Sequence, residues 1–454
     1  MPESIPVASL LKTHPEYNPK LQMPVGVTAP SLTVYNDLYV GGAAFDANQN
    51  WYLERRPTDS IPEVRAARLR CAAYVNHVAA IVDWMAGDIF TQEPAIEGPE
   101  GNEYWNLLND NADGSGRDFG AVIYQAALSC MKFGRAYLAL DFPDAPADSL
   151  ATSKSSSPRE NRGKADAYLC AFDADAVDDW QLDENGALKW VRVHTVEHMR
   201  PMYGIGDWRN RHTWTYLFKD GKETYTALTG PNSAQFDSST NAMGTATTYN
   251  YGGALPVIPV QIPAGLWVLN RIYRGALAVF NADAASTSLH RQTCLQVPVI
   301  ISDSPAKVLT ISEYAALHLS LGSTFGFQGP QGPALADARA FGEAQESKLY
   351  KTMQALPLLA PGQVQNARQS GSAKEQDLSA PKVMVNAYRA ALNDAAETAI
   401  RLLQQVRGEE DLEITITGLE SKAPEQNPLD AQTGKDTAIP MRTTPQAGPT
   451  RTVA

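Results

Sequence analysis

The chain has 454 residues, with 38 Lys plus Arg against 50 Asp plus Glu and a formal net charge of −12 at pH 7. Hydrophobic residues make up 44% and charged residues 19%, which are ordinary values for a folded protein. The length allows hydrophobic cores for about two to four domains. Disorder of the whole chain and a small disulfide-stapled module are therefore excluded. The acidic balance also argues against a protein that grips nucleic acid by neutralising phosphates, but it permits one that nucleic acid slides past.

The four cysteines, at positions 71, 130, 170 and 294, lie far apart, without a CxxC pair or metal-ligand spacing. They are predicted to be structural thiols in a reducing compartment. The N-terminus lacks a basic segment followed by an apolar one, so no secretory signal is expected. Prolines interrupt the most apolar stretch, residues 253–272, which argues against a membrane span. The chain is therefore expected to be soluble and made in the cytoplasm.

The N-terminal 50 residues, rich in Pro and Asn, are predicted to form an extended arm. The string Ser-Ile-Pro-Glu at 60–63 is typical of a capped helix start, with Glu three positions after Ser. Apolar residues at helical spacing follow it, which predicts one long amphipathic helix over 64–90.

A second helix is predicted over 118–133, because Gly134 is a natural residue to end it. The alternating pattern of residues 135–141 then predicts a strand. Residues 143–166 contain few core-forming side chains and are expected to be a mobile loop.

Between residues 168 and 228 the hydrophobic period becomes two, the spacing of strands. Asn185-Gly186 and Asp220-Gly221 each separate two such runs and are favoured two-residue hairpin turns. Two hairpins of one antiparallel sheet are therefore predicted, followed by a polar loop over 230–253 and a short strand over 255–262.

The remainder is predicted to be mostly helical, with helices over 266–289, 334–356 and 383–406. Strands are predicted over 297–302 and 412–417. The segments between and after them are predicted to be a Gly/Pro loop over 322–333, a flexible stretch over 357–371 and a disordered tail beyond 423. The helix over 266–289 carries small residues such as Gly275, Ala278 and Ala282. This pattern suits packing against identical copies and burial in a monomer core about equally well.

The string His194-Thr195-Val196-Glu197-His198 matches the H-x-x-E-H pattern of inverted zinc proteases. That chemistry needs a helix, so that both imidazoles meet one zinc ion, whereas this string continues a period-two run over 188–193. A strand end is the favoured interpretation. A metal-dependent α+β hydrolase that uses His194, Glu197 and His198 stays as the alternative.

Other catalytic patterns are missing, since the sequence contains neither a phosphate-binding P-loop nor a nucleophile elbow. Carboxylate pairs such as Asp178-Asp179 are expected to be solvated. No enzyme activity, catalytic residue, metal or cofactor is predicted.

The order of these elements resembles that of the portal proteins of tailed bacteriophages, over most of the chain. The segments that carry the resemblance are AALSCMKFGRAYLALDFP at 126–143, NGALKWV at 185–191, LPVIPV at 255–260 followed by a long helix and VPVI at 297–300, and QSGSAK at 369–374. The resemblance implies an α+β subunit of a twelve-membered ring, with wing, stem and clip regions around an axial channel for DNA packaging and ejection.

The resemblance also implies a domain map: arm and wing 1–265, first stem helix 266–293, clip 294–333, second stem helix 334–356, tunnel loop 357–371, wing helix and strand 372–418, and a tail or vestigial crown 419–454. Expected partners are other copies of the chain, the major capsid protein, the terminase large subunit, adaptor and tail proteins, and double-stranded DNA. The expected location is the portal vertex of the virion, after assembly in the host cytoplasm.

Three groups of site residues follow from the resemblance. The tunnel loop would bring Gln363, Gln365, Asn366 and Arg368 nearest the DNA. Lys348 and Lys351 would line the channel from the second stem helix, with ordinary solvated charges as the alternative. Phe325, Phe327 and Gln328 would lie at the exposed part of the clip that binds terminase or adaptor. The acidic charge, multiplied in a ring, would keep the duplex off the channel wall.

Overall fold

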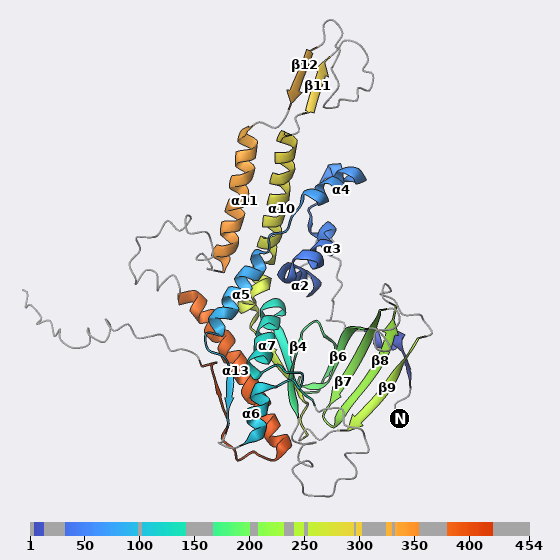
Figure 1. The fold of residues 1–454 in the computed structure, drawn as a ribbon, viewed down its shortest axis with the longest axis vertical. Helices are drawn as coiled ribbons and strands as arrows, with labels where there is room; N and C mark the ends of the chain where they lie inside the picture. The colour runs from blue at the N-terminus through green and yellow to red at the C-terminus, as the bar shows by residue number, and fades with distance from the viewer. Residues whose placement is uncertain are drawn as a thin grey trace, which may run out of the picture. The chain divides into compact units, whose positions relative to one another are not determined.

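The computed structural model describes residues 4–12, 32–98, 102–141, 167–199, 208–230, 240–248, 253–294, 297–301, 324–328, 332–353 and 379–420 (Figure 1). These residues all belong to one compact unit within residues 1–420. Every strand pair that the structure describes is antiparallel, so the fold is α+β as predicted. The predictions for the loop at 143–166, the stretch at 357–371 and the tail lie outside the described residues.

The N-terminal region is more regular than the predicted extended arm, and that prediction is wrong for the described part. It contains β1 (Ile5–Pro6), α1 (Val7–Leu10), α2 (Leu32–Val40) and α3 (Gly42–Tyr52). Both longer helices place aromatic side chains in the core, with Tyr35 and Phe45 almost fully buried. Tertiary packing therefore orders a segment whose composition alone favours loops.

The long helix predicted over 64–90 is wrong, because the chain forms two helices, α4 (Pro62–Cys71) and α5 (His77–Ile89). Asn76 caps α5, since its Oδ1 accepts a hydrogen bond from the Ala79 N–H (2.9 Å). Tyr74, in the connection, stacks on Phe45 at 4.0 Å between ring centroids. The predicted cap is absent too, because the Ser60 hydroxyl donates to the Pro57 carbonyl in η1 (Pro57–Ser60).

The helix α7 (Phe119–Phe133) has the predicted start and stop. Asp118 Oδ1 accepts from the Ala121 N–H (2.6 Å), and Gly134 has the left-handed conformation with φ 77°. The predicted strand follows directly as β3 (Arg135–Asp141). It is the middle strand of a three-stranded sheet with the order β10-β3-β4, where β4 is Tyr168–Asp173 and β10 is Val257–Gln261.

A six-stranded sheet has the order β1-β9-β8-β7-β6-β5. Its strands are β5 (Val177–Leu182), β6 (Leu188–Met199), β7 (Arg209–Phe218), β8 (Gly221–Thr229) and β9 (Asn241–Thr248), joined by β1. The two predicted hairpins, β5–β6 and β7–β8, are confirmed. The polar loop predicted over 230–253 is wrong, since β9 pairs with both β8 and β1.

The turn of the second hairpin differs by one residue from the prediction. Phe218 pairs with Gly221, so Lys219 and Asp220 form the turn and Gly221 begins β8. A Cβ atom on Gly221 would lie 2.3 Å from the Thr247 carbonyl oxygen, so glycine is needed for the close approach of β9.

The C-terminal half contains the predicted long helices, as α10 (Val268–Cys294), α11 (Gly332–Thr352) and α13 (Ser379–Arg407). Between α10 and α11 the chain forms the antiparallel pair β11 (Val297–Ile301) and β12 (Thr324–Gln328). The Gly/Pro loop predicted over 322–333 is therefore wrong, because β12 and the start of α11 occupy it. The predicted last strand is β13 (Thr415–Thr417), which pairs with β2 (Ala95–Glu97).

The main core gathers α2, α3, α5, α7, α10, α13 and the three-stranded sheet, with α6 (Glu103–Asp110) contributing the buried Trp105. A smaller core joins α1 to the six-stranded sheet around Trp214. Burial raises the pKa of the Cys130 thiol and raises that of Cys170 to about 12, which fits the prediction of structural thiols. None of the described helices combines the length and apolar composition that crossing a bilayer requires.

Candidate functional site: the helical hairpin and the arginine corner

The helices α10 and α11 pack along each other as a hairpin that leaves the main core and returns to it (Figure 1). Gly275 lies against Leu349, since a Cβ at position 275 would come within 3.1 Å of Leu349 Cδ1. A Cβ on Gly342 would lie 3.5 Å from Asp283 Oδ1. The small residues at 275 and 342 thus serve helix packing within one chain.

Both ends of the hairpin are bonded to the main core. The Tyr388 hydroxyl of α13 donates to the Leu266 carbonyl (3.1 Å), just before α10 begins. At the returning end, the Tyr350 hydroxyl of α11 lies 3.0 Å from His77 Nδ1 of α5. Residues 268–353 therefore form a hairpin that extends from one core, and hydrogen bonds join both ends of the hairpin to that core at its base.

The two lysines predicted to line a channel, Lys348 and Lys351, are exposed on α11. Leu349, which lies between them, is buried against Gly275, so the lysines lie on the part of α11 that faces away from α10. Their exposure agrees with a channel role and with ordinary solvated charges alike.

The predicted docking residues Phe325, Phe327 and Gln328 are in β12, opposite Ile300, Pro298 and Val297 of β11. They belong to a strand pair at the turn of the hairpin, in place of the predicted loop. The predicted DNA-facing residues Gln363, Gln365, Asn366 and Arg368 lie outside the described residues.

The string His194 to His198 lies in β6, which confirms the favoured strand interpretation. His198 lies four residue steps along the strand from His194, about 13 Å away, and Glu197 points to the opposite face. His194 Nε2 instead lies 3.1 Å from His212 Nδ1, and His198 Nδ1 lies 2.7 Å from Asn210 Oδ1. Across the described ranges, no three His, Cys, Asp or Glu side chains are grouped to hold a metal ion.

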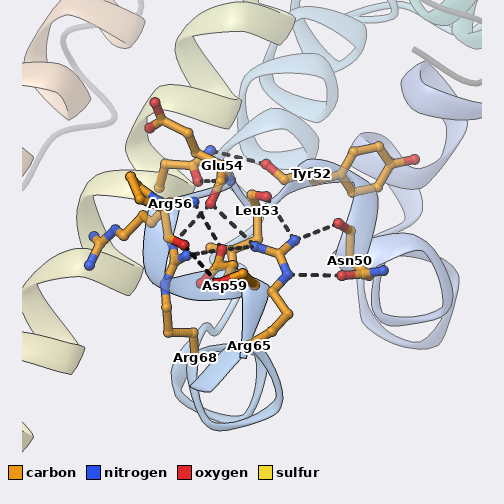
Figure 2. A network of polar contacts seen from close by, with 11 residues as sticks. Asn50, Tyr52, Leu53, Glu54, Arg56, Asp59, Arg65 and Arg68 are labelled. Carbon is orange, nitrogen blue, oxygen red and sulfur yellow. Dashed lines mark hydrogen bonds and ion pairs between the residues drawn. The ribbon is translucent and has the colours of Figure 1, made fainter. Parts of the chain in front are cut away.

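A polar cluster that the sequence did not predict lies where α3 leads through η1 into α4 (Figure 2). Asp59 accepts hydrogen bonds from Arg65 (2.9 Å) and Arg68. Arg65 also donates to the carbonyls of Asn50 (2.7 Å) and Leu53 (2.9 Å). These carbonyls lie at the C-terminal end of α3, where helical partners are missing, so the guanidinium group caps that helix.

Asp59 is held as a carboxylate by these contacts. The hydrogen bond from Arg68 lowers the pKa of Asp59 to about 2, with further lowering from the Arg56 N–H and Arg65. The Asp59 side chain is only 5% exposed, and its Oδ1 atom meets no hydrogen-bond donor from the described ranges.

Residues 54–71 together with Arg291 are called the arginine corner below. Arg55, Arg56, Arg70 and Arg291 are exposed there. A hollow of about 410 Å³ is lined by residues that include Arg55, Arg56, Asp59 and Arg65, and another of about 300 Å³ lies between α4 and α10. In the second, Arg291 of α10 donates to Cys71 Sγ of α4 (2.9 Å). The run of five arginines at 55, 56, 65, 68 and 70 is the sequence signal that could have indicated this cluster.

No family model and no curated protein matches this chain. Among solved structures, the chain is similar to a chain in the neck of an empty GTA particle, at 10% identity and a TM-score of 0.41, over 80% of this chain and 86% of that one. It is also similar to a chain in the virion of a native gene transfer agent particle, at 11% identity and a TM-score of 0.40, over 91% and 97%. All these scores lie below 0.5, so the function proposed below is argued from the chain's own elements.

Proposed function

We propose that this chain is a structural ring subunit of a phage-like portal vertex, with an axial channel through which DNA is packaged and ejected. The observation that carries the proposal is the α10–β11–β12–α11 excursion, which leaves an α+β core and returns to it. In the resemblance described above, such a hairpin is the stem and the strand pair at its turn is the clip.

The way in which α13 closes the core supports the same assignment. Arg389 of α13 is buried and donates to the carbonyls of Ile89 (2.9 Å) and Asp88 (2.7 Å) at the C-terminal end of α5. The chain on both sides of the hairpin therefore contributes to one core. A base of this kind suits a stem that must keep its position within a ring.

The charge of the chain also suits a conduit. A net charge of −12 on each copy disfavours tight binding of a duplex, because binding relies on cations that release counterions from phosphates. In the proposed ring, Lys348 and Lys351 face the channel, and the tunnel loop with Gln363, Gln365, Asn366 and Arg368 lies nearest the DNA. The clip, with Phe325, Phe327 and Gln328, binds the terminase during packaging and then the adaptor and tail.

Size measurement tests this proposal. Twelve copies of a 49.2 kDa chain have a mass of about 590 kDa, which light scattering on purified protein measures directly. A particle of that order supports the ring. A 49.2 kDa monomer that carries zinc would contradict it and would favour the metal-dependent hydrolase.

The channel residues need a separate test. Changing Lys348 and Lys351 together to Glu is expected to leave the ring intact, because both side chains are exposed, and to reduce nuclease-protected DNA in a packaging assay. Changing the exposed Lys382 of α13 to Glu is the control. Equal amounts of nuclease-protected DNA in both variants would show that Lys348 and Lys351 do not line the channel.

A further inference from the structure

The arginine corner is a positive surface on a negative chain. Residues 54–71 contain five arginines and three acids, Glu54, Asp59 and Glu63, and Arg291 brings the net charge of the corner to +3. Since the whole chain carries −12, all other residues together carry −15. A surface of this sign is complementary to most of the remaining surface of the same protein.

The side chains exposed at the corner are those that dominate protein interfaces. Trp51, at the end of α3, is 58% exposed, and Ile61, just before α4, is 51% exposed. Trp and Arg are the residue types most enriched among the contacts that contribute most to binding. An exposed Trp three residues before the corner in sequence, together with the four exposed arginines of the corner, favours a surface that binds another protein.

The corner is also rigid before any partner arrives. Asp59 and the carbonyls of Asn50, Leu53 and Glu54 hold Arg65 and Arg68 in place (Figure 2), so little side-chain entropy of these two arginines is lost when a partner contacts the corner.

The partner is best sought in a second copy of this chain. A symmetric contact of the corner with itself would place arginines against arginines, so the corner must meet a different surface. A heterologous contact gives a ring where the rotation between neighbours closes and an open filament where it does not, and the proposed ring requires the first. On α10, Ser288 lines the hollow beside α4, and helical periodicity places it roughly 140° from Gly275, which faces α11. The corner and α11 thus lie on opposite sides of α10.

The exposed side of α11 has the complementary features. In its N-terminal half, Asp337 and Glu343 are exposed, and Phe341 between them is 57% exposed. The exposed Arg339 leaves residues 332–346, which also contain Glu346, with a net charge of −2. Helical periodicity places Asp337 and Phe341 on the face of α11 that also carries Lys348 and Lys351, roughly 10–16 Å along the axis, so a neighbour that covers only the N-terminal half leaves the two lysines facing the channel. We propose that the arginine corner of one copy docks on the N-terminal half of α11, residues 332–346, of the next copy. This inference rests on the proposed ring and names the surface through which its neighbours meet.

Site-specific crosslinking tests the contact in the full chain. A photoreactive p-benzoylphenylalanine replaces Trp51, and isotope-labelled and unlabelled copies are mixed before assembly, so that mass spectrometry identifies crosslinks between copies. Crosslinks between copies that reach residues 332–346 support the proposal. Crosslinks between copies only at other surfaces, or none between copies in a particle shown by light scattering to be a ring, overturn it. A monomer in light scattering would contradict the ring itself.

Charge reversal provides the second measurement. Arg70→Glu is expected to raise the protomer concentration for half-assembly roughly tenfold, and adding Asp337→Lys is expected to restore part of it. Arg209→Glu, at an exposed position of β7, is the matched control and should assemble as the wild type does. Equal assembly of the Arg70 and Arg209 variants would overturn the contact. A second outcome would also overturn the contact: the wild type binds a short DNA duplex tightly, and Arg70→Glu abolishes that binding while Arg209→Glu does not. Nucleic acid would then be the partner of the corner.

Discussion

Gly275 of α10 and Leu349 of α11 are in direct contact, so close that a Cβ at position 275 would come within 3.1 Å of Leu349 Cδ1 and Leu349 would have to shift to accept a larger residue there. This contact sets the distance between the two helices of the hairpin, because ridges and grooves of packed helices must interlock. The hairpin carries the proposed stem, so its packing can be tested independently of any ring.

Gly275→Leu is expected to destabilise the protein by about 1–3 kcal/mol, since extra methylene groups in a packed contact force backbone shifts. The matched control is Gly87→Leu in α5, where a Cβ meets no atom within 4 Å. That control should be neutral or slightly stabilising, because leucine favours helices over glycine. Urea unfolding measures both, and equal losses would contradict the proposed packing.

A second prediction concerns Arg192, which is 1% exposed and pairs with Asp178 at 2.6 Å. It also donates to the Lys12 carbonyl (2.7 Å), so it joins the N-terminal segment to the six-stranded sheet. Arg192→Leu should cost about 3–5 kcal/mol of folding free energy, because Asp178 is left buried and unpaired.

Arg209→Leu, on an exposed part of the same sheet, should change that free energy little. Adding Asp178→Asn to Arg192→Leu should recover part of the loss, because the orphaned charge is removed. If the single and double variants unfold at the same urea concentration, the buried charge is not the cause.

The third prediction is a dependence of stability on pH. Burial lowers the pKa of His194 to about 4, with smaller contributions from His212 and Arg192. A lowered pKa means that the stabilising contribution is present above the unfolded value of 6.5 and is lost as the pH falls toward 4. The full loss is on the order of 3 kcal/mol, but Asp178, whose Oδ2 lies 4.0 Å from His194 Nδ1, opposes it, because burial raises the pKa of Asp178 to about 6 and its carboxyl group takes up a proton in the folded state over the same pH range.

Thermal unfolding between pH 7 and pH 4 measures this loss. Since Asp178 offsets the loss in the wild type, His194→Gln should gain stability relative to the wild type as the pH falls from 6.5 toward 4, whereas His198→Gln, at an exposed position, should follow the wild-type profile. A His194→Gln profile parallel to that of the wild type would contradict the burial argument.

The arginine corner has its own acid limit. Because Arg68 and its neighbours lower the pKa of Asp59 to about 2, the stabilising effect of the Asp59 carboxylate is present above pH 4 and is lost as the pH falls from about 3.8 to 2.

At pH 8 the Asp59 carboxylate holds Arg65 and Arg68, so Asp59→Asn should speed trypsin cleavage after these two arginines, whereas Glu54→Gln should not. Equal cleavage rates would show that Asp59 does not hold the two arginines.

Local signals predicted well wherever one residue determines the backbone. Asp118 and Gly134 determine the ends of α7, and Asn185-Gly186 indicated the β5–β6 hairpin. The prediction of secondary structure failed where contacts with residues distant in sequence determine whether a segment forms a helix, a strand or a break. Gln49 donates to the Ala72 carbonyl (2.6 Å) in the break between α4 and α5, and β9 becomes a strand by pairing with β8 and β1. No pattern within 64–90 or 230–253 carries those contacts.

The candidate sites show the same limit. Lys348, Lys351 and the residues of β12 could be assigned to the hairpin because long helical and strand patterns surround them. The arginine corner could not, because Arg65 and Arg68 gain their role from the carbonyls of Asn50, Leu53 and Glu54, which a helical pattern does not reveal. The run of arginines was visible, but its partners were not.

The ring is the central claim, and electron microscopy of the purified full chain tests it most directly. End-on class averages should show a closed ring with an axial hole and twelve repeats. Averages that show only small, solid particles without rotational symmetry, at concentrations where the protein is folded, would contradict the account.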